Sequence, residues 1–176
     1  FASLSQFSRK LGTILMNSRS LFFAIAAASL FLLPQADAQE WSRFRGKDGA
    51  GIGNMTGLRH QIKESDYLWS TSLEGVGHSS PVLWGGKLFL TLADADGANR
   101  RLECYDAASG IRLWGWEAPL EAHNLHKFNN FASSTPVADA DRVYAAWGSG
   151  KHTEAIALDH AGKLVWKREW PGFTSD

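Results

Sequence analysis

The fold of this chain is decided by one short stretch, residues 105–114, which reads YDAASGIRLW. Its pattern predicts a strand end, a tight turn and a new strand closed by a tryptophan, since Asp bonds the backbone of its own turn and Gly supplies a positive φ. Residues 158–166 repeat the pattern as LDHAGKLVW, with Asp159 lying 53 positions after Asp106 and Trp166 lying 52 after Trp114. A unit that recurs at about fifty residues indicates a repeat architecture.

The similarity between the two copies extends upstream of the turn. The letters SSPV at 79–82 match STPV at 134–137, and GKLF at 86–89 match DRVY at 141–144, both at an offset of 55 positions. The offset falls to 53 across residues 93–100, a polar segment in which a loop can lose two residues without disturbing strands.

Each copy contains four short segments with the character of strands. In the first copy we predict strands over residues 80–84, 87–92, 101–105 and 111–116, with Gly85 and Gly86 as a two-residue hairpin. Side chains alternate with a period of two, as in a strand. The apolar positions that carry this alternation are Leu88, Leu90 and Leu92 in the first copy and Val143, Ala145 and Trp147 in the second.

Four strands per repeat are typical of a β-propeller blade. We therefore predict an all-β fold, an incomplete propeller over residues 67–176 with blades at about 78–118 and 131–171. A strand of an earlier blade is expected at 67–73. Since propellers typically have four to eight blades, we expect the 176 residues to be an N-terminal fragment. A tryptophan at the same place in each blade would fill the gap between neighbours. The residues expected to serve this docking are Trp69, Trp114 and Trp166, with the turn residues Asp106, Asp159, Gly110 and Gly162.

The N-terminal region has the parts of a secretory signal. Residues 16–38 contain Arg19, an apolar run at 21–33, Pro34, and a small-x-small site that ends at Ala38. We expect cleavage after this site and export to the periplasm or the medium. The apolar run is shorter than the ~20 residues that span a bilayer, so no stable membrane span is expected. We interpret residues 1–15 as an upstream extension foreign to the natural protein.

The mature chain is expected to open with an extended segment, residues 39–66. Its glycines at 46–53 form neither a calcium loop nor a phosphate loop, because the acidic ligands and the strand-to-helix context are missing. Cys104 is the single cysteine, so the chain has no internal disulfide, and we predict that its thiol is buried.

The most polar stretch lies between the two blades and reads EAHNLHKFNN at 121–130. Two interpretations stay open: a loop whose side chains satisfy backbone groups, or a binding loop, because binding residues concentrate on loops. The candidate binding residues are His123, His126, Lys127 and Asn129, for an unknown protein or polysaccharide. We predict no metal site, because zinc takes three or four protein ligands and only Glu121 accompanies the histidines.

We predict no catalytic residues. Ser79 or Ser133 could be combined with His78 and Asp106 as a hydrolase triad, but no G-x-S-x-G pattern occurs. The 18 basic and 18 acidic residues cancel, so electrostatics favour neither nucleic acid nor an anionic membrane as a partner.

The repeat carries a resemblance to a known family. Residues 104–114 and 157–166 resemble the tryptophan-docking repeat of pyrroloquinoline-quinone-type β-propellers. The letters WSRFRG at 41–46, the SSP and STP strand starts, and HKFN at 126–129 resemble exported quinoprotein-like propellers abundant in Planctomycetes. The resemblance covers residues 41–173 and implies a ring of about seven or eight blades.

The family includes quinone-dependent alcohol and sugar dehydrogenases and also members that bind no quinone. The resemblance implies for the dehydrogenases a calcium site of carboxylates and amides, a catalytic Asp and often a pair of adjacent cysteines. No position here matches these features, so we expect no cofactor in this segment and a binding or scaffold module rather than an enzyme. The alternatives are the N-terminal part of a quinone- and calcium-dependent dehydrogenase or the propeller of the outer-membrane assembly machinery, which a missing lipobox Cys disfavours.

Overall fold

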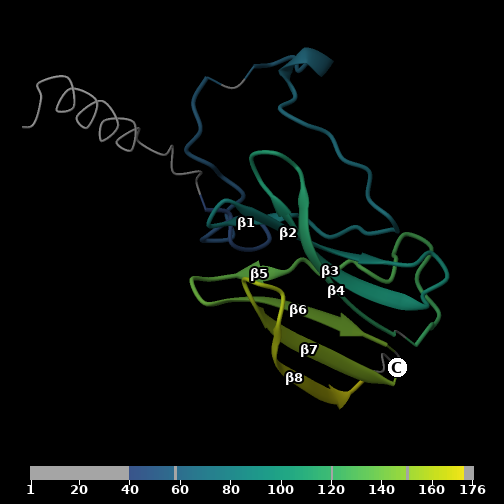
Figure 1. Ribbon diagram of the computed structural model, residues 1–176. Coiled ribbons are helices and arrows are strands. Elements are labelled where there is room, and N and C mark those ends of the chain that lie inside the picture. The colour runs from purple at the N-terminus through teal and green to yellow at the C-terminus, as the bar shows by residue number, and fades with distance from the viewer. Residues whose placement is uncertain (1–39, 58, 120, 150, 173–176) are drawn as a thin grey trace, which may run out of the picture. The chain divides into compact units, whose positions relative to one another are not determined.

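A computed structural model describes residues 40–57, 59–119, 121–149 and 151–172. The predicted upstream extension and signal sequence, residues 1–38, lie outside the described residues. The described part contains a short 3₁₀ helix, η2 (Glu64–Asp66), and eight strands (Figure 1). The strands are β1 (Val82–Trp84), β2 (Lys87–Ala93), β3 (Asn99–Asp106), β4 (Arg112–Pro119), β5 (Val137–Ala138), β6 (Arg142–Gly148), β7 (His152–Asp159) and β8 (Leu164–Pro171).

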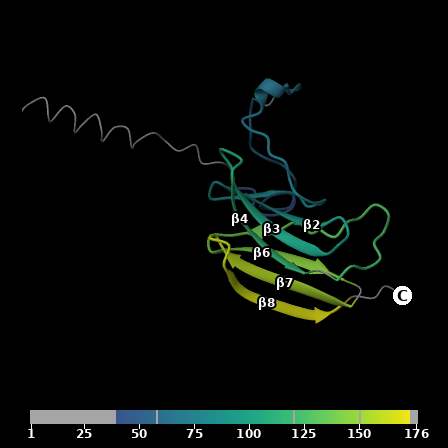
Figure 2. The same ribbon diagram turned by 45° about the vertical axis from the view of Figure 1, so that its right-hand side comes forward.

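The strands form two four-stranded antiparallel sheets in sequential order, β1-β2-β3-β4 and β5-β6-β7-β8. Figure 2 shows the two sheets as neighbouring layers. The predicted all-β class and the two four-stranded units are confirmed. Sequential antiparallel strands of this number are the arrangement of a propeller blade.

The turns form at the Gly and Asp residues from which they were predicted. Gly85 and Gly86 have φ of 55° and 71° and join β1 to β2, with Trp84 paired to Lys87. In the repeated turn, the Asp106 carbonyl accepts a bond of 2.8 Å from the Gly110 amide. The equivalent bond from Gly162 to Asp159 is 3.0 Å. The local chemistry of Gly and Asp therefore sets both connections.

Two tryptophans dock on the repeated turns. The Trp114 Nε1 donates a 3.1 Å hydrogen bond to the His160 carbonyl, and a Cβ added to Gly162 would lie 2.7 Å from Trp114 Cδ2. Trp69 repeats this geometry one unit earlier. Its Nε1 donates to the Ala107 carbonyl at 3.0 Å, and a Cβ at Gly110 would lie 2.5 Å from its Cδ2. Each turn glycine thus supplies a positive φ and also leaves room for an indole.

The segment at 67–73 differs from the prediction of a strand. The structure assigns it no strand, although Trp69 docks as described above. A strand requires a hydrogen-bonded neighbour, and no described strand lies beside this segment. Val76, further along, forms an isolated antiparallel bridge with Ala93 at the end of β2.

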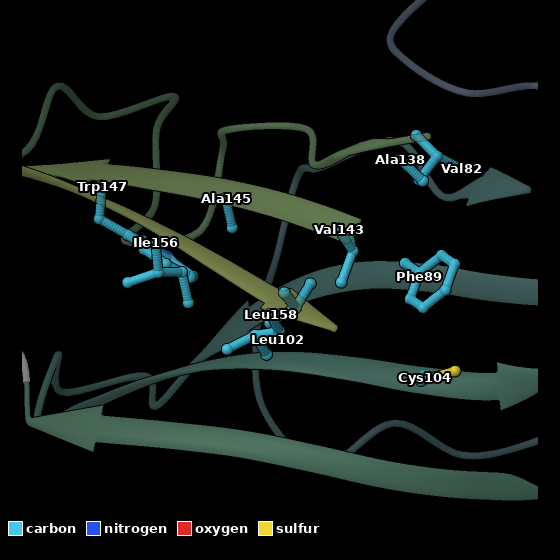
Figure 3. Close-up of a cluster of buried hydrophobic side chains, with 10 residues drawn as sticks. All are labelled: Val82, Phe89, Leu102, Cys104, Ala138, Val143, Ala145, Trp147, Ile156 and Leu158. Carbon is cyan, nitrogen blue, oxygen red and sulfur yellow. The ribbon is translucent and has the colours of Figure 1, made fainter. Parts of the chain in front are cut away.

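The main core lies between the two sheets (Figure 3). The first sheet contributes Val82, Phe89, Leu102 and Cys104, and the second contributes Ala138, Val143, Ala145, Trp147, Ile156 and Leu158. The predicted burial of Cys104 and the predicted face of β6 are confirmed.

The β2 strand is buried on both faces rather than on alternate residues. Its Leu90 and Leu92 form a second cluster with Tyr105, while Phe89 belongs to the main core. Leu88 packs against this second cluster, and residues 89–93 are buried without interruption. The period-two alternation therefore identified a strand but did not predict its exposure.

The start of the described chain ties the two sheets together. Trp41 pairs with Leu83 of β1 through hydrogen bonds of 2.9 and 3.0 Å, and the Ser42 carbonyl accepts one of 2.8 Å from Ala138 of β5. This segment therefore connects the first strand of each sheet. No helix in the described ranges is long and apolar enough to cross a membrane.

The docking contact is tested by comparing two glycine substitutions that share a positive φ. Gly162→Ala places a methyl against Trp114, whereas Gly86→Ala, with φ of 71°, meets no atom within 4 Å. We expect Gly86→Ala to lower the free energy of unfolding by about 1–2 kcal/mol through backbone strain. Gly162→Ala should cost a further ~1–3 kcal/mol from overpacking. Equal losses in urea unfolding would contradict the docking role.

The buried thiol provides a second test. Burial raises the pKa of Cys104 to about 12, with Asp106 adding to the effect and Lys87 opposing it. Because the folded pKa exceeds the unfolded value of about 8.5, the stabilisation is present below about pH 8.5 and is lost as pH rises towards 12. At about pH 9, iodoacetamide should label the denatured chain rapidly and the folded chain only as it unfolds. Equal labelling rates would contradict a buried thiol.

Candidate binding site at one end of the sheets

Antiparallel order brings three connections to the same end of the two sheets. These are the β2–β3 loop, the β6–β7 loop and the long β4–β5 connection, residues 120–136. A Cβ at Gly97 in the first loop would lie 2.7 Å from Phe131 Cζ of the connection. Lys151 in the second loop forms a 2.5 Å ion pair with Glu121. The β4–β5 connection therefore contacts both neighbouring loops.

The β4–β5 connection is held in shape by its own polar side chains. Asn130 Oδ1 accepts a 2.9 Å bond from the Ala132 amide, and Ser133 Oγ donates to Asn129 Oδ1 and to the Asn130 carbonyl. The Ala132 carbonyl accepts bonds of 3.1 Å from the amides of His78 and Ser79. These bonds agree with one of the two interpretations of the sequence, in which side chains of the loop satisfy the hydrogen-bonding groups of its backbone.

A cavity of about 190 Å³ lies between this connection and the end of β6. Its lining contains polar, aromatic and small side chains and no Asp, Glu, Lys or Arg. The residues are His123, Leu125, Asn129, Asn130, Phe131, Ser133, Ser134, Ala146, Trp147 and Gly148. The buried Nε1 of Trp147 has no hydrogen-bond partner within the described residues.

The four predicted binding residues divide into two groups. His123 and Asn129 line the cavity. His126 and Lys127 instead flank Phe128, whose side chain is 74% exposed. The ring centroid of Phe128 lies 5.5 Å from that of His126 and 4.8 Å from Lys127 Nζ. The connection therefore presents a partly open cavity and, separately, an exposed aromatic tip.

The hydrogen bond of His123 determines its tautomer when the ring is neutral. Nδ1 lies 3.1 Å from the Glu121 carbonyl, and a carbonyl only accepts, so Nδ1 carries the proton. Nε2 is then an acceptor. The ring also meets Phe131 edge-on at a centroid distance of 5.3 Å.

An aromatic stack with a buried ion pair supports the cavity wall. Trp147 stacks on Trp116 with centroids 6.0 Å apart, and Arg100 Cζ lies 5.5 and 5.9 Å from the two rings. Arg100 pairs with Glu154 across the two sheets and donates to the Pro119 carbonyl. Glu154 also pairs with Lys167 at 2.5 Å.

From the sequence, Trp147 was expected only on the face of a strand. No site role was predicted for Arg100, Trp116 or Glu154. One signal was present for Trp147, because it stands where the first copy has Leu92, 55 positions earlier. A large aromatic that departs from the repeat marks a place where the two units differ. Arg100 and Glu154 lie 54 positions apart in no local motif, so only the packing of the sheets brings them together.

The serines and the aspartate considered for a hydrolase triad each bond to other groups. Ser79 Oγ donates to the Thr91 carbonyl at 3.0 Å, Ser133 Oγ bonds within its loop, and Asp106 accepts from Ser109. The bonds from Ser109 lower the pKa of Asp106. Among the described residues, no group of three or more His, Cys, Asp and Glu side chains is placed to hold a metal.

A second, wider hollow of about 510 Å³ lies beside the β2–β3 loop. It is lined by Glu74, Gly75, Asp94, Ala95, Asp96 and Arg101. Arg101 pairs with Asp94 at 2.9 Å and donates to the Glu74 carbonyl at 2.7 Å. Two of its charged groups, Arg101 and Asp94, are therefore already engaged with each other.

Comparison with known proteins finds similarity among solved structures only. No family model matches the chain, and no curated protein matches it. Among solved structures, a europium-containing methanol dehydrogenase is similar, with 20% sequence identity and a TM-score of 0.37. The alignment covers 51% of this chain and 15% of the dehydrogenase.

The ion pair behind the cavity is tested by removing one charge. Glu154→Gln leaves the buried Arg100 without its carboxylate, which should lower the free energy of unfolding by about 3–5 kcal/mol. The double variant Arg100→Met with Glu154→Met removes both charges and should recover most of the loss, as measured by chemical denaturation. A Glu154→Gln variant as stable as the parent would contradict an energetically coupled pair.

Proposed function

We propose that this chain is part of an exported β-propeller that acts as a binding module and engages an extracellular polymer through its β4–β5 connection. The observation that carries the proposal is the exposed Phe128 at the tip of that connection, flanked by His126 and Lys127. Large aromatics that combine apolar area with adjacent polar groups are typical of binding hot spots. Burying this ring on a partner would remove apolar surface from water.

The hydrogen bonds around the tip support a presenting role. The Asn129 amide bonds the His126 carbonyl at 2.8 Å, which closes a turn around Lys127 and Phe128. The next residues anchor the turn through Ala132, whose carbonyl accepts two amides from the start of the first sheet. A loop ordered before binding loses less conformational entropy when it meets a partner.

Export is part of the proposal and is supported by the sequence pattern at 16–38. A charged n-region, an apolar run and a small-residue cleavage site form a secretory signal. The single Cys, buried in the main core, fits stabilisation by packing instead of by a disulfide.

The proposal is tested by affinity electrophoresis of the chain through gels that contain soluble neutral or acidic polysaccharides. We expect retardation by at least one polymer, and Phe128→Ser should weaken it about tenfold or more, the scale of a hot-spot aromatic. Phe44→Ser is the matched control, because Phe44 is also exposed, at 59%, but lies in the segment that pairs with β1 and β5.

Two results would contradict the proposal. One is retardation that is absent with every polymer or equal in the parent and Phe128→Ser. The other is dye reduction with alcohols or aldoses after addition of quinone and calcium, which would instead support the dehydrogenase alternative.

A further inference from the structure

We infer that the cavity lined by His123, Phe131 and Trp147 is a subsite for one uncharged sugar ring of a polysaccharide. This inference rests on the proposed binding function and names the chemical class of its ligand. The cavity is separate from the exposed tip, because Phe128 is absent from its lining. Trp147 and Ser134 can therefore be changed without altering the tip, whereas Asn129 belongs to both.

The size of the cavity matches a single ring-sized group. A volume of about 190 Å³ corresponds to about six waters at ~30 Å³ each. A protein partner would instead cover a broad surface of about 800 Å² on each side. A partly open cavity of this size beside a loop therefore favours one small unit of a repetitive polymer.

The electrostatics of the cavity favour a neutral ligand. No carboxylate, ammonium or guanidinium group lines it. The nearby charges already have partners, since Arg100 pairs with Glu154 behind the wall and Lys151 pairs with Glu121 in the loops. A charged ligand would lose hydration without gaining an opposite charge, which is costly.

The polar groups of the cavity suit hydroxyls. His123 Nε2 is an acceptor in the neutral ring, and Asn129 and Asn130, which carry amide N–H donors, also line the cavity. A hydroxyl both donates and accepts, so a polyol satisfies both kinds of group. Phe131 and Trp147 supply aromatic surface for the apolar C–H face of a sugar ring.

The test follows indole N–H resonances by heteronuclear NMR during titration with methyl glucoside, methyl galactoside and glucuronate. Trp147→Phe assigns the Trp147 signal by its disappearance. We expect a saturable shift of this signal with at least one neutral glycoside and a weaker response, by at least tenfold in affinity, with glucuronate. Trp147→Phe leaves a smaller aromatic ring in the wall, so less apolar surface is buried and the glycoside should bind about three- to tenfold more weakly by calorimetry.

A second pair of variants separates binding from folding. Ser134 lines the cavity with an exposed side chain, so Ser134→Leu should fill the space and abolish glycoside binding while the thermal melt is retained. Phe44→Ser, at an exposed residue outside the cavity lining, should bind as the parent does. The inference is overturned if no neutral glycoside shifts the Trp147 signal, if glucuronate binds as tightly, or if Ser134→Leu binds normally.

The outcomes also distinguish this inference from the proposed function. If retardation by a polymer depends on Phe128 but is unaffected by Ser134→Leu, the sugar subsite is contradicted. The proposed binding module is then still supported. If glycosides bind in the cavity but no polymer retards the chain, polymer binding through the tip is contradicted instead.

Discussion

The structure depends on the contact between the Trp114 indole and the Gly162 backbone of the next sheet. The indole occupies the space that a Cβ at residue 162 would need, and its Nε1 donates a hydrogen bond to the His160 carbonyl. The ring therefore gains apolar contact while its polar N–H keeps a partner. Trp69 forms the same pair of contacts with the first sheet at Gly110 and Ala107. A contact that recurs once per unit sets how each unit lies against the next.

This stacking makes the rest of the core possible. Once the sheets face each other, ten buried side chains share one cluster, and the Arg100–Glu154 pair crosses between them with little exposure. Trp116 from one sheet then stacks on Trp147 from the other. The candidate cavity lies where that stack meets the β4–β5 connection: most of its lining comes from the connection, and Ala146, Trp147 and Gly148 of β6 complete it.

The repeat, the strands and the turns were predictable because their causes are local. Alternating apolar residues specify strands, paired glycines specify a hairpin, and an Asp with a Gly three or four residues later specifies the repeated turn. The candidate site was only partly predictable. Polarity drew attention to His123 and Asn129, but their cavity also requires Trp147, which is distant in the sequence.

By itself the sequence determined that this chain forms two similar four-stranded units with tryptophan-bearing turns. Only the tertiary structure decided that β2 is buried on both faces, and that the segment at 67–73 docks its tryptophan without forming a strand. It also decided that His123 and Trp147 share a cavity while Phe128 stays outside. The reason is physical: turn and strand preferences act over a few residues, whereas burial, ion pairing and cavity shape arise from groups that meet only when separate sheets pack.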